Sequence, residues 1–224
     1  NFPVSTRRKF LDRILLGSAF CLFVAALVWV FYPSGNRTWH LLITGANKGR
    51  ISSYLGRFHP YKDRKVGGAA HAVTLLENAI ASFAGAPYSL VSLGNEFSGS
   101  SEAYFTRGQA IAEIFNTFHL DAMLVGNLDF SFGVARLREL AHVSSFPLLS
   151  SNIVQEGSGS SPDFLSGELT VHPGNGLNIA LLGLTPPATP NLTAPVNVQG
   201  LRFENPGNVL PQKISRLRQG GADL

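Results

Sequence analysis

Short apolar runs bounded by turn residues alternate with apolar residues at helical spacing from about residue 40 to residue 224. Runs of this length are typical of buried strands. The strands predicted in this way span residues 41–44, 88–93, 122–125, 147–150 and 178–184. Strands that alternate with helices favour an α/β domain with layers around a sheet.

Three apolar stripes at helical spacing lie between these strands and predict helices with a core-facing side. Their members are Ala69, Val73, Leu76, Ile80 and Phe83, then Ile111, Ile114, Phe115 and Phe118, then Val134, Leu137 and Leu140. A last helix is expected over residues 209–219. Residues 157–162 predict a surface loop, and the Pro- and Thr-rich residues 186–197 predict an irregular stretch that reaches toward a partner.

The longest apolar run, residues 14–31, contains no charge and is about long enough to cross a bilayer as a helix. Four basic residues precede it and only Arg37 follows closely, which predicts a cytoplasmic amino terminus and an extracytoplasmic body at the inner membrane. No small-residue cleavage site follows, so an uncleaved anchor is expected. The expected organisation is a basic segment (1–13), a transmembrane helix (14–32), a linker (33–39) and a body (40–224).

The basic segment also resembles a twin-arginine export signal, because Arg7 and Arg8 are adjacent and Phe10 and Leu11 follow at the right offset. The alternative interpretation is that these charges only orient the anchor. The amino termini of Rieske subunits in quinol-oxidising complexes look similar, although no Cys-His cluster follows here. Small residues in the apolar run, such as Ser18 and Ala25, predict contact with a partner helix.

Composition narrows the function classes. Hydrophobic residues make up 45% of the 224 residues and charged residues 14%, which argues against a disordered or coiled-coil chain. The first thirteen residues carry +3 of the net charge of +4, so a basic nucleic-acid-binding face on the body is not expected. The single cysteine, Cys21, excludes internal disulfides, thiolate-held iron–sulfur clusters and c-type haem, and no cofactor is expected.

The loop after the first predicted strand, residues 43–50 (ITGANKGR), taken alone resembles the dinucleotide-binding turn of short-chain dehydrogenases. Ile51 and Ser52 stand where the last glycine of that turn is required. The only Tyr-x-x-x-Lys, from Tyr61 to Lys65, follows too soon to be the catalytic pair of that family. Nicotinamide binding is therefore not expected.

Three loops taken together resemble the calcineurin-like metallophosphoesterase domain of the 5′-nucleotidase type, over about residues 40–224. The matching segments are ANKGR at 46–50 for the family's D-x-H-G-R, SLGNEFSG at 92–99 for D-x-G-D-x-F-x-G, GNLDFSFG at 126–133 for G-N-H-E-F-D-x-G, and Phe146-Pro147 with Asn152-Ile153 for F-P-x-x-x-x-N-I. The resemblance implies an α/β fold of the family's layered, sandwich type. It also implies a site for two metal ions at the strand ends.

The residues at the implied metal positions are Ala46, Lys48, Asn95, Asn127 and Leu128. Alanine has no donor atom, and an ammonium has no lone pair and repels a cation. The amide at the bridging position carries no charge, and leucine cannot transfer the proton that the family's histidine transfers. Only Asn127 keeps a ligand type, so neither a metal ion nor a catalytic residue is expected here.

Other polar residues do not restore this site. Lys48 has two interpretations, either an ion pair with Asp129 that holds the old pocket shut or a solvated side chain. The histidines are expected to be surface or satisfied core residues: His40 before the first strand, His59 in a loop, His71, His119 and His142 on or beside helices, and His172 in an edge hairpin.

The expected function is that of a non-catalytic, membrane-anchored accessory subunit of a larger complex, with a respiratory or photosynthetic electron-transfer complex as host. The expected partners are other subunits and the lipid bilayer, and not nucleic acid. One alternative is a metal-dependent phosphohydrolase whose ligands come from a divergent site or from beyond Leu224. Another is a solute or nucleotide sensor that uses the vestigial cleft. Whether the natural chain continues past Leu224 is left open.

Overall fold

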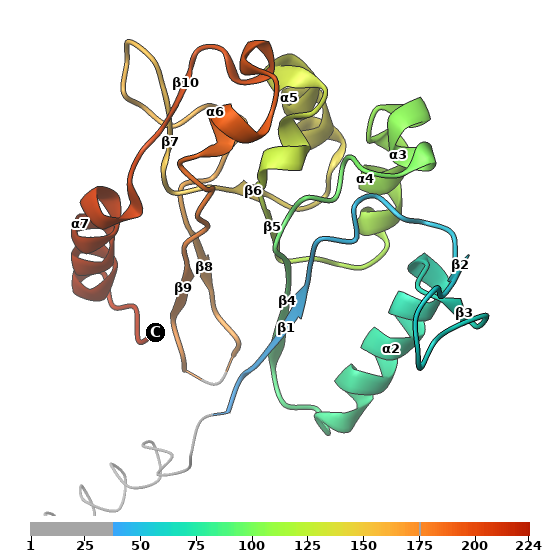
Figure 1. The fold of residues 1–224 in the computed structure, drawn as a ribbon. Coiled ribbons are helices and arrows are strands. Elements are labelled where there is room, and N and C mark those ends of the chain that lie inside the picture. Colours follow the sequence, from blue (N-terminus) through green and yellow to red (C-terminus); the bar gives the residue numbers. More distant parts are fainter. Residues whose placement is uncertain (1–37, 175) are drawn as a thin grey trace, which may run out of the picture. The chain divides into compact units, whose positions relative to one another are not determined.

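A parallel sheet of four short strands lies at the centre of the fold (Figure 1). The structure, a computed structural model, describes residues 38–174 and 176–224. The strands follow the order β1-β4-β5-β6 and pair in parallel throughout. They are β1 (His40–Thr44), β4 (Tyr88–Ser92), β5 (Ala122–Leu124) and β6 (Leu148–Leu149). The predicted α/β class is confirmed, and four of the predicted strands lie in this sheet.

Side chains of the inner strands alternate between two apolar layers, as the period of two along a strand requires. Leu90, Met123 and Leu148 point into the larger core cluster, whereas Val91 and Ala122 belong to a smaller cluster on the opposite face. Strand β4 is buried at four of its five positions. Such continuous burial is typical of parallel strands that are covered on both faces.

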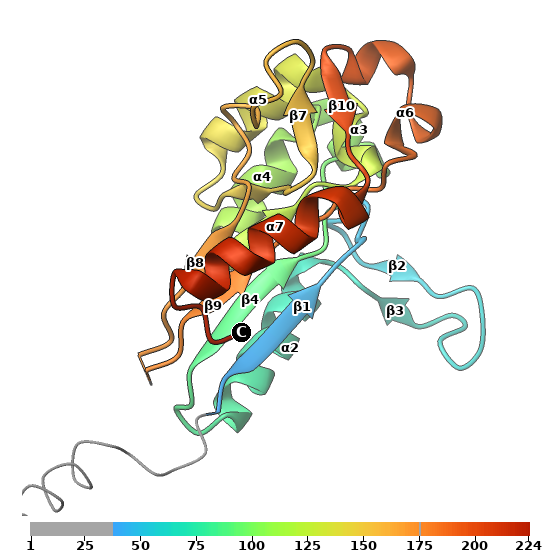
Figure 2. The ribbon, with the colours of Figure 1, turned by 90° about the vertical axis from the view of Figure 1, so that its left-hand side faces the viewer.

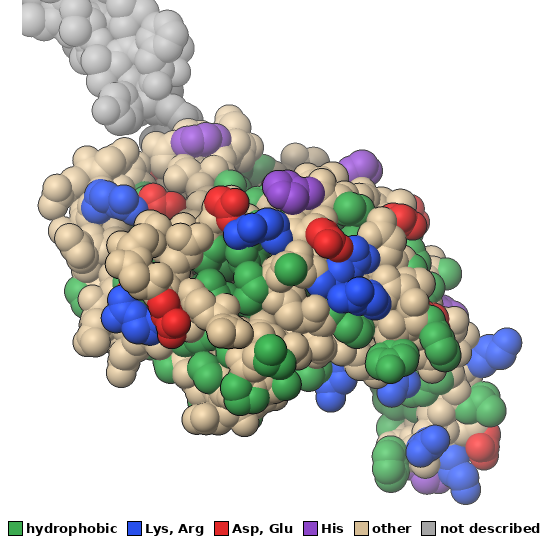
Figure 3. Space-filling model, turned by 90° about the horizontal axis from the view of Figure 1, so that it is seen from above, with side chains coloured by type: hydrophobic (Ala, Val, Ile, Leu, Met, Phe, Trp, Pro, Cys, Tyr) green, Lys and Arg blue, Asp and Glu red, His purple; other side chains and the backbone are tan. Residues whose placement is uncertain are grey.

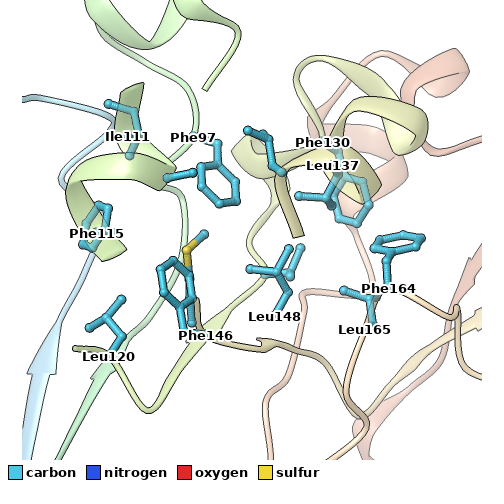
Figure 4. Close-up of a cluster of buried hydrophobic side chains, with 14 of the residues drawn as sticks. Phe97, Ile111, Phe115, Leu120, Phe130, Leu137, Phe146, Leu148, Phe164 and Leu165 are labelled. Atoms are coloured by element: carbon cyan, nitrogen blue, oxygen red, sulfur yellow. The ribbon is translucent and has the colours of Figure 1, made fainter. Parts of the chain in front are cut away.

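Helices form the connections between the parallel strands. They are α2 (Ala69–Ser82) between β1 and β4, α3 (Ser101–Thr106) and α4 (Gln109–Asn116) between β4 and β5, and α5 (Gly133–Val143) between β5 and β6. The larger core lies under α4 and α5, where Phe97, Phe130 and Leu137 are fully buried (Figure 4). Helix α2 contains no fully buried residue, so the first predicted stripe is a half-buried face and not core.

An antiparallel hairpin of β8 (Leu169–Val171) and β9 (Ile179–Leu181) covers the smaller cluster. Helix α7 (Pro206–Gln219) runs beside this hairpin (Figure 2). The backbone after α7 is tied to β9, since Ala180 N–H donates to the carbonyl of Leu224 at 2.9 Å. A separate antiparallel pair joins β7 (Ile153–Gln155) to β10 (Leu201–Phe203).

Several element boundaries differ from the sequence-based predictions. The predicted strand 178–184 is paired only over β9, because the backbone leaves the hairpin and Ser151 N–H donates to the carbonyl of Gly183 at 2.7 Å. The last helix begins at Pro206, three residues before the predicted start, because the Asn205 side chain accepts from Gly207 N–H and proline suits the first turn. The stretch 186–197, predicted to be irregular, contains α6 (Thr189–Leu192) and most of the 3₁₀ helix η2 (Pro195–Val198).

A small hairpin of β2 (Tyr54–Leu55) and β3 (Lys65–Val66) follows the first loop and was not predicted. The predicted anchor, export signal and most of the linker lie outside the described residues. Within the part of the chain that the structure describes, no helix is long and apolar enough to cross a membrane.

Candidate functional site

The loops that follow β1, β4 and β5 meet at the carboxyl edge of the sheet. Ala46 N–H donates to the carbonyl of Gly94 at 3.2 Å, and Leu128 N–H donates to Asn95 Oδ1 at 2.9 Å. This edge is the usual ligand-binding place of open parallel sheets. The structure therefore brings all three predicted loops together: Ala46 and Lys48 lie on the first, Asn95 on the second, and Asn127 and Leu128 on the third.

The turn after β4 sets the position of Asn95. Gly94 has a φ of 80°, and a Cβ atom there would lie 2.2 Å from the carbonyl oxygen of Leu124, so only glycine fits without displacing β5. Asn95 follows with a φ of 59°, and its side chain lies against the backbone of Gly126. The amide oxygen of Asn95 is thus engaged inside the protein by the backbone N–H of Leu128.

Asp129 ties the second loop to the third. Its side chain is almost fully buried and accepts four backbone hydrogen bonds. The donors are Asn95 N at 2.7 Å, Glu96 N at 2.9 Å, Phe97 N at 3.0 Å and Gly126 N at 2.9 Å. Burial raises the pKa of Asp129, and the four N–H donors oppose that rise because they stabilise the carboxylate. The suggested Asp129 ion pair with Lys48 is wrong, since no such pair is present among the described residues and backbone N–H groups engage both carboxylate oxygens.

Glu96 ties the first loop to the second in the same way. Its carboxylate accepts from Ser92 Oγ at 2.9 Å, from Asn47 N at 3.1 Å and from Asn47 Nδ2 at 3.3 Å. Burial raises the pKa of Glu96 to about 7, and repulsion from the nearby Asp129 carboxylate adds to this, whereas the hydrogen bond from Ser92 lowers it. Glu96 is therefore a buried group that titrates near neutral pH.

Ala46 and Lys48 lie on the exposed outer part of the first loop and both have left-handed backbone conformations, with φ of 54° and 53°. They line a groove of about 520 Å³ between this loop, α2 and α4. The far wall of the groove is apolar and includes Ile114 and Phe118. Nothing at these two positions offers a lone pair to a cation.

His71 lines the same groove as Ala46 and Lys48 of the first loop, whereas the other histidines are not in the lining of that groove. His40, expected to precede the first strand, is the first residue of β1, which begins one position earlier than predicted, and its ring stacks on Phe83 with 3.9 Å between centroids. The others are placed as predicted, with His59 in the β2–β3 loop, His71 in α2, His119 after α4, His142 in α5 and His172 directly after β8. Across residues 38–174 and 176–224, no group of three or more His, Cys, Asp or Glu could hold a metal ion.

The donor set does not fit the two metal ions that the family resemblance implies. Divalent ions at such a site require anionic or neutral oxygen and nitrogen donors that converge on one point. Glu96 and Asp129, the buried carboxylates nearby, point into the loops and are engaged by N–H and O–H donors. A cation would have to displace those hydrogen bonds, so these residues support no chemical step through a metal.

Sequence reasoning missed the roles of both carboxylates. Asp129 occupies the position of the glutamate in the family's G-N-H-E-F-D segment, so an acid is kept there although the neighbouring histidine is Leu128. Glu96 lies at a position that the motif leaves variable. The available signal was one acid in each of two loops that contain no other charged residue, because a carboxylate that becomes buried requires several donors.

Comparison with known proteins relates the chain to 5′-nucleotidases. No protein-family profile matches it. It is 29% identical over 136 residues to Protein UshA of Yersinia enterocolitica and 31% identical over 111 residues to snake venom 5′-nucleotidase of Crotalus adamanteus. These matches cover 61% and 47% of this chain. They span only 24% and 18% of the two relatives.

The fold is similar to that of a solved protein that is also named as a 5′-nucleotidase. The 5′-nucleotidase precursor from Thermus thermophilus superposes with a TM-score of 0.70 and 22% identity, covering 82% of this chain and 35% of that protein. The described body thus has an α/β, metallophosphoesterase-like fold, and this part of the prediction is confirmed.

Proposed function

We propose that the body is a non-catalytic domain of a membrane-anchored accessory subunit, in which the former catalytic edge of the sheet has become structural. One observation carries the proposal. The polar groups that converge at the strand ends, Asn95, Glu96 and Asp129, are engaged by donors of the three loops themselves. A phosphoesterase would need such groups free to face metal ions and substrate.

The membrane part of this proposal rests on the sequence. The uncharged run 14–31, the basic residues before it and the twin-arginine-like Arg7-Arg8 support an anchor with an extracytoplasmic body. The similarity of the anchor to Rieske subunits supports an electron-transfer complex as host. A rigid α/β domain in which, of the implied metal positions, only Asn127 keeps a ligand type is suited to docking rather than to catalysis.

A gain-of-ligand comparison tests the loss of catalysis. The full chain is purified in mild detergent beside a variant with A46D, K48H, N95D and L128H, which supplies the donors that the family motif has at these positions. We expect no stoichiometric metal in the natural chain by elemental analysis, no nucleotide hydrolysis, and metal uptake by the variant. Two metal ions per natural chain, with phosphatase activity that chelation abolishes, would overturn the proposal.

A test of assembly examines the accessory role. Membranes of the source cell are solubilised mildly and the chain is followed through native separation. Migration in a particle much larger than the chain, together with stable co-migrating subunits, supports the proposal. Migration as a free monomer, under conditions in which other membrane complexes stay intact, contradicts it.

The second candidate is a metal-dependent phosphohydrolase, and the similarity to proteins named as 5′-nucleotidases favours it. In that case the ligands come from a divergent site or from residues beyond Leu224. The same metal and hydrolysis measurements on the natural chain decide between the two candidates.

A further inference from the structure

Residues 50–65, which we call the basic arm, contain the β2 strand, the loop that follows it and the first residue of β3. The described residues 38–224 carry thirteen basic and thirteen acidic side chains. The arm holds one of those acids, Asp63, and five of the basic residues: Arg50, Arg57, Lys62, Arg64 and Lys65. The arm therefore has a net charge of +4, and the rest of residues 38–224 has a net charge of −4.

The positive charge of the arm is exposed and not neutralised. All five basic side chains are exposed, and none of them is in an ion pair with another described residue. Arg50 lies over the ring of Tyr54, with 4.6 Å from the guanidinium carbon to the ring centroid. Two acids lie close to this cluster, Asp63 within the arm and Glu102, which lines the same depression as Arg50, and the residues of the arm keep a net charge of +4.

Large apolar side chains are interleaved with these charges. Phe58 is 82% exposed, Leu55 59% and Tyr61 57%. Together with Arg57 and Lys62 they line an open groove of about 970 Å³. Exposed apolar side chains gathered in this way mark a contact surface.

The arm projects from the body and is held in shape by its backbone. It stands out at the right of Figure 2 and at the lower right of Figure 3, where blue and green side chains alternate. Gly56 donates to the carbonyl of Arg64 at 2.8 Å, and a Cβ atom at Gly56 would lie 2.1 Å from the carbonyl oxygen of Tyr61. The two sides of the loop are thus closely packed at this glycine.

Helix α3 adds aromatic side chains beyond a depression whose lining is mostly polar and includes Ser100, Ser101 and Glu102. Tyr54 of the arm and Tyr104 of α3 line the same depression, and the neighbouring Phe105 is 83% exposed. The rings of Tyr104 and Phe105 are in edge contact, with 5.8 Å between centroids. The arm and α3 therefore present aromatic side chains around the same depression.

We propose that the basic arm docks on an anionic phospholipid surface, with its aromatic and leucine side chains at the headgroup level and its cations on lipid phosphates. Rings and basic residues interleaved along one element are typical of interfacial segments. The cores of protein interfaces are depleted in charge and in lysine, whereas here each apolar side chain has a cation nearby. Because the rest of the described body has a net charge of −4, an anionic surface repels it and attracts the arm, so the body approaches such a surface with the arm in front.

This proposal adds a contact to the proposed membrane attachment, and the experiment measures the two separately. The full chain, with Cys21 changed to serine, receives one cysteine for an environment-sensitive dye, either H59C in the arm or Q199C after η2. Each form is added to phosphatidylcholine vesicles with or without phosphatidylglycerol. The matched variant, R57Q/K62Q/R64Q, lowers the net charge of the arm from +4 to +1 at three exposed positions whose change should leave the unfolding midpoint unaltered.

We expect a blue shift of the dye at residue 59 with phosphatidylglycerol vesicles, which high salt and the triple variant abolish, and no shift at residue 199. Loss of three cations should reduce docking by roughly a hundredfold. An equal shift without phosphatidylglycerol, no shift at residue 59, or a shift produced by a soluble oligonucleotide or polyglutamate but not by vesicles would each overturn the proposal. Carbonate-resistant flotation reports the anchor separately, so either attachment can fail without the other.

Discussion

Replacing Asp129 by asparagine is the sharpest test of the idea that this carboxylate holds the strand-end loops together. Asparagine has nearly the same shape, so the change leaves the packing intact and alters only the hydrogen bonding. In the structure Oδ1 accepts from the backbone N–H groups of Glu96 and Phe97, and Oδ2 accepts from those of Asn95 and Gly126. An amide can serve only one of these two pairs, and its own N–H groups face the other pair.

The cost follows from the donors left without an acceptor. Each buried, unsatisfied donor costs about 1–3 kcal/mol, so D129N should lower the free energy of unfolding by about 2–6 kcal/mol. This is a large share of the roughly 5–15 kcal/mol that stabilises a typical domain. Changing Asp129 to alanine would leave four donors unsatisfied, so the asparagine variant is the one more suited to measurement.

Urea unfolding of the full chain in mild detergent measures this loss. Trp39 is a suitable probe because its Nε1 donates to Ser89 Oγ at 3.2 Å, and a W29F background makes it the sole tryptophan. The matched control is D163N, which removes a surface ion pair with Arg138 and should change stability by less than about 1 kcal/mol. If D129N also loses less than about 1 kcal/mol, with an unchanged denaturant slope, the carboxylate does not hold the loops.

Three further outcomes are expected. Burial raises the pKa of Glu96 from 4.5 to about 7, so protonated Glu96 stabilises the fold fully below about pH 4.5. This stabilisation is lost as the pH rises to about 7. The variant E96Q cannot titrate, so it should flatten this part of the pH profile of the unfolding midpoint. The fully buried Asn152 bonds both the N–H and the carbonyl of Thr185, so N152A should cost about 2–4 kcal/mol in the same urea assay. The double variant R7K/R8K should impair export, as measured by protease accessibility of the body in intact spheroplasts, whereas normal export would leave only an orienting role for these charges.

The sequence predicted the sheet well because its strands and loops depend on local signals. Apolar runs ended by turn residues located β1, β4, β5 and β6 to within two residues at each end. The resemblance placed the three loops together, and the structure shows the backbone contacts that join them. The predicted end of a strand was wrong where a contact with a distant residue ends the pairing. At β9 the chain leaves its partner strand, and Gly183 accepts a hydrogen bond from Ser151 N–H instead.

The hydrogen bonds inside the candidate site were harder to predict, because several groups compete to bind each buried carboxylate. Lys48 and Asp129 were plausible partners by charge alone. Three successive backbone N–H groups, of residues 95–97, converge on Asp129 because the left-handed turn at Gly94 aims them at one point, and Gly126 N–H adds a fourth from the third loop; a side-chain pattern cannot show this. The basic arm was missed for a different reason: the charge of the body was averaged over 211 residues, which hid a +4 cluster against a −4 remainder.

The carboxylate network explains how the fold can keep its loop geometry at a site whose donors do not suit metal ions. In a metal-bound site, cations draw loops together through shared ligands. Here Glu96 connects the first loop to the second and Asp129 connects the second to the third, each through backbone N–H donors. Together with the bond from Leu128 N–H to Asn95 Oδ1, acids that bond backbone amides can perform this joining whatever side chains stand at positions 46, 48 and 128. Because the loops are held in this way, residues at those positions can change without separating the loops. The carboxyl edge of the sheet then stabilises the body and no longer performs chemistry.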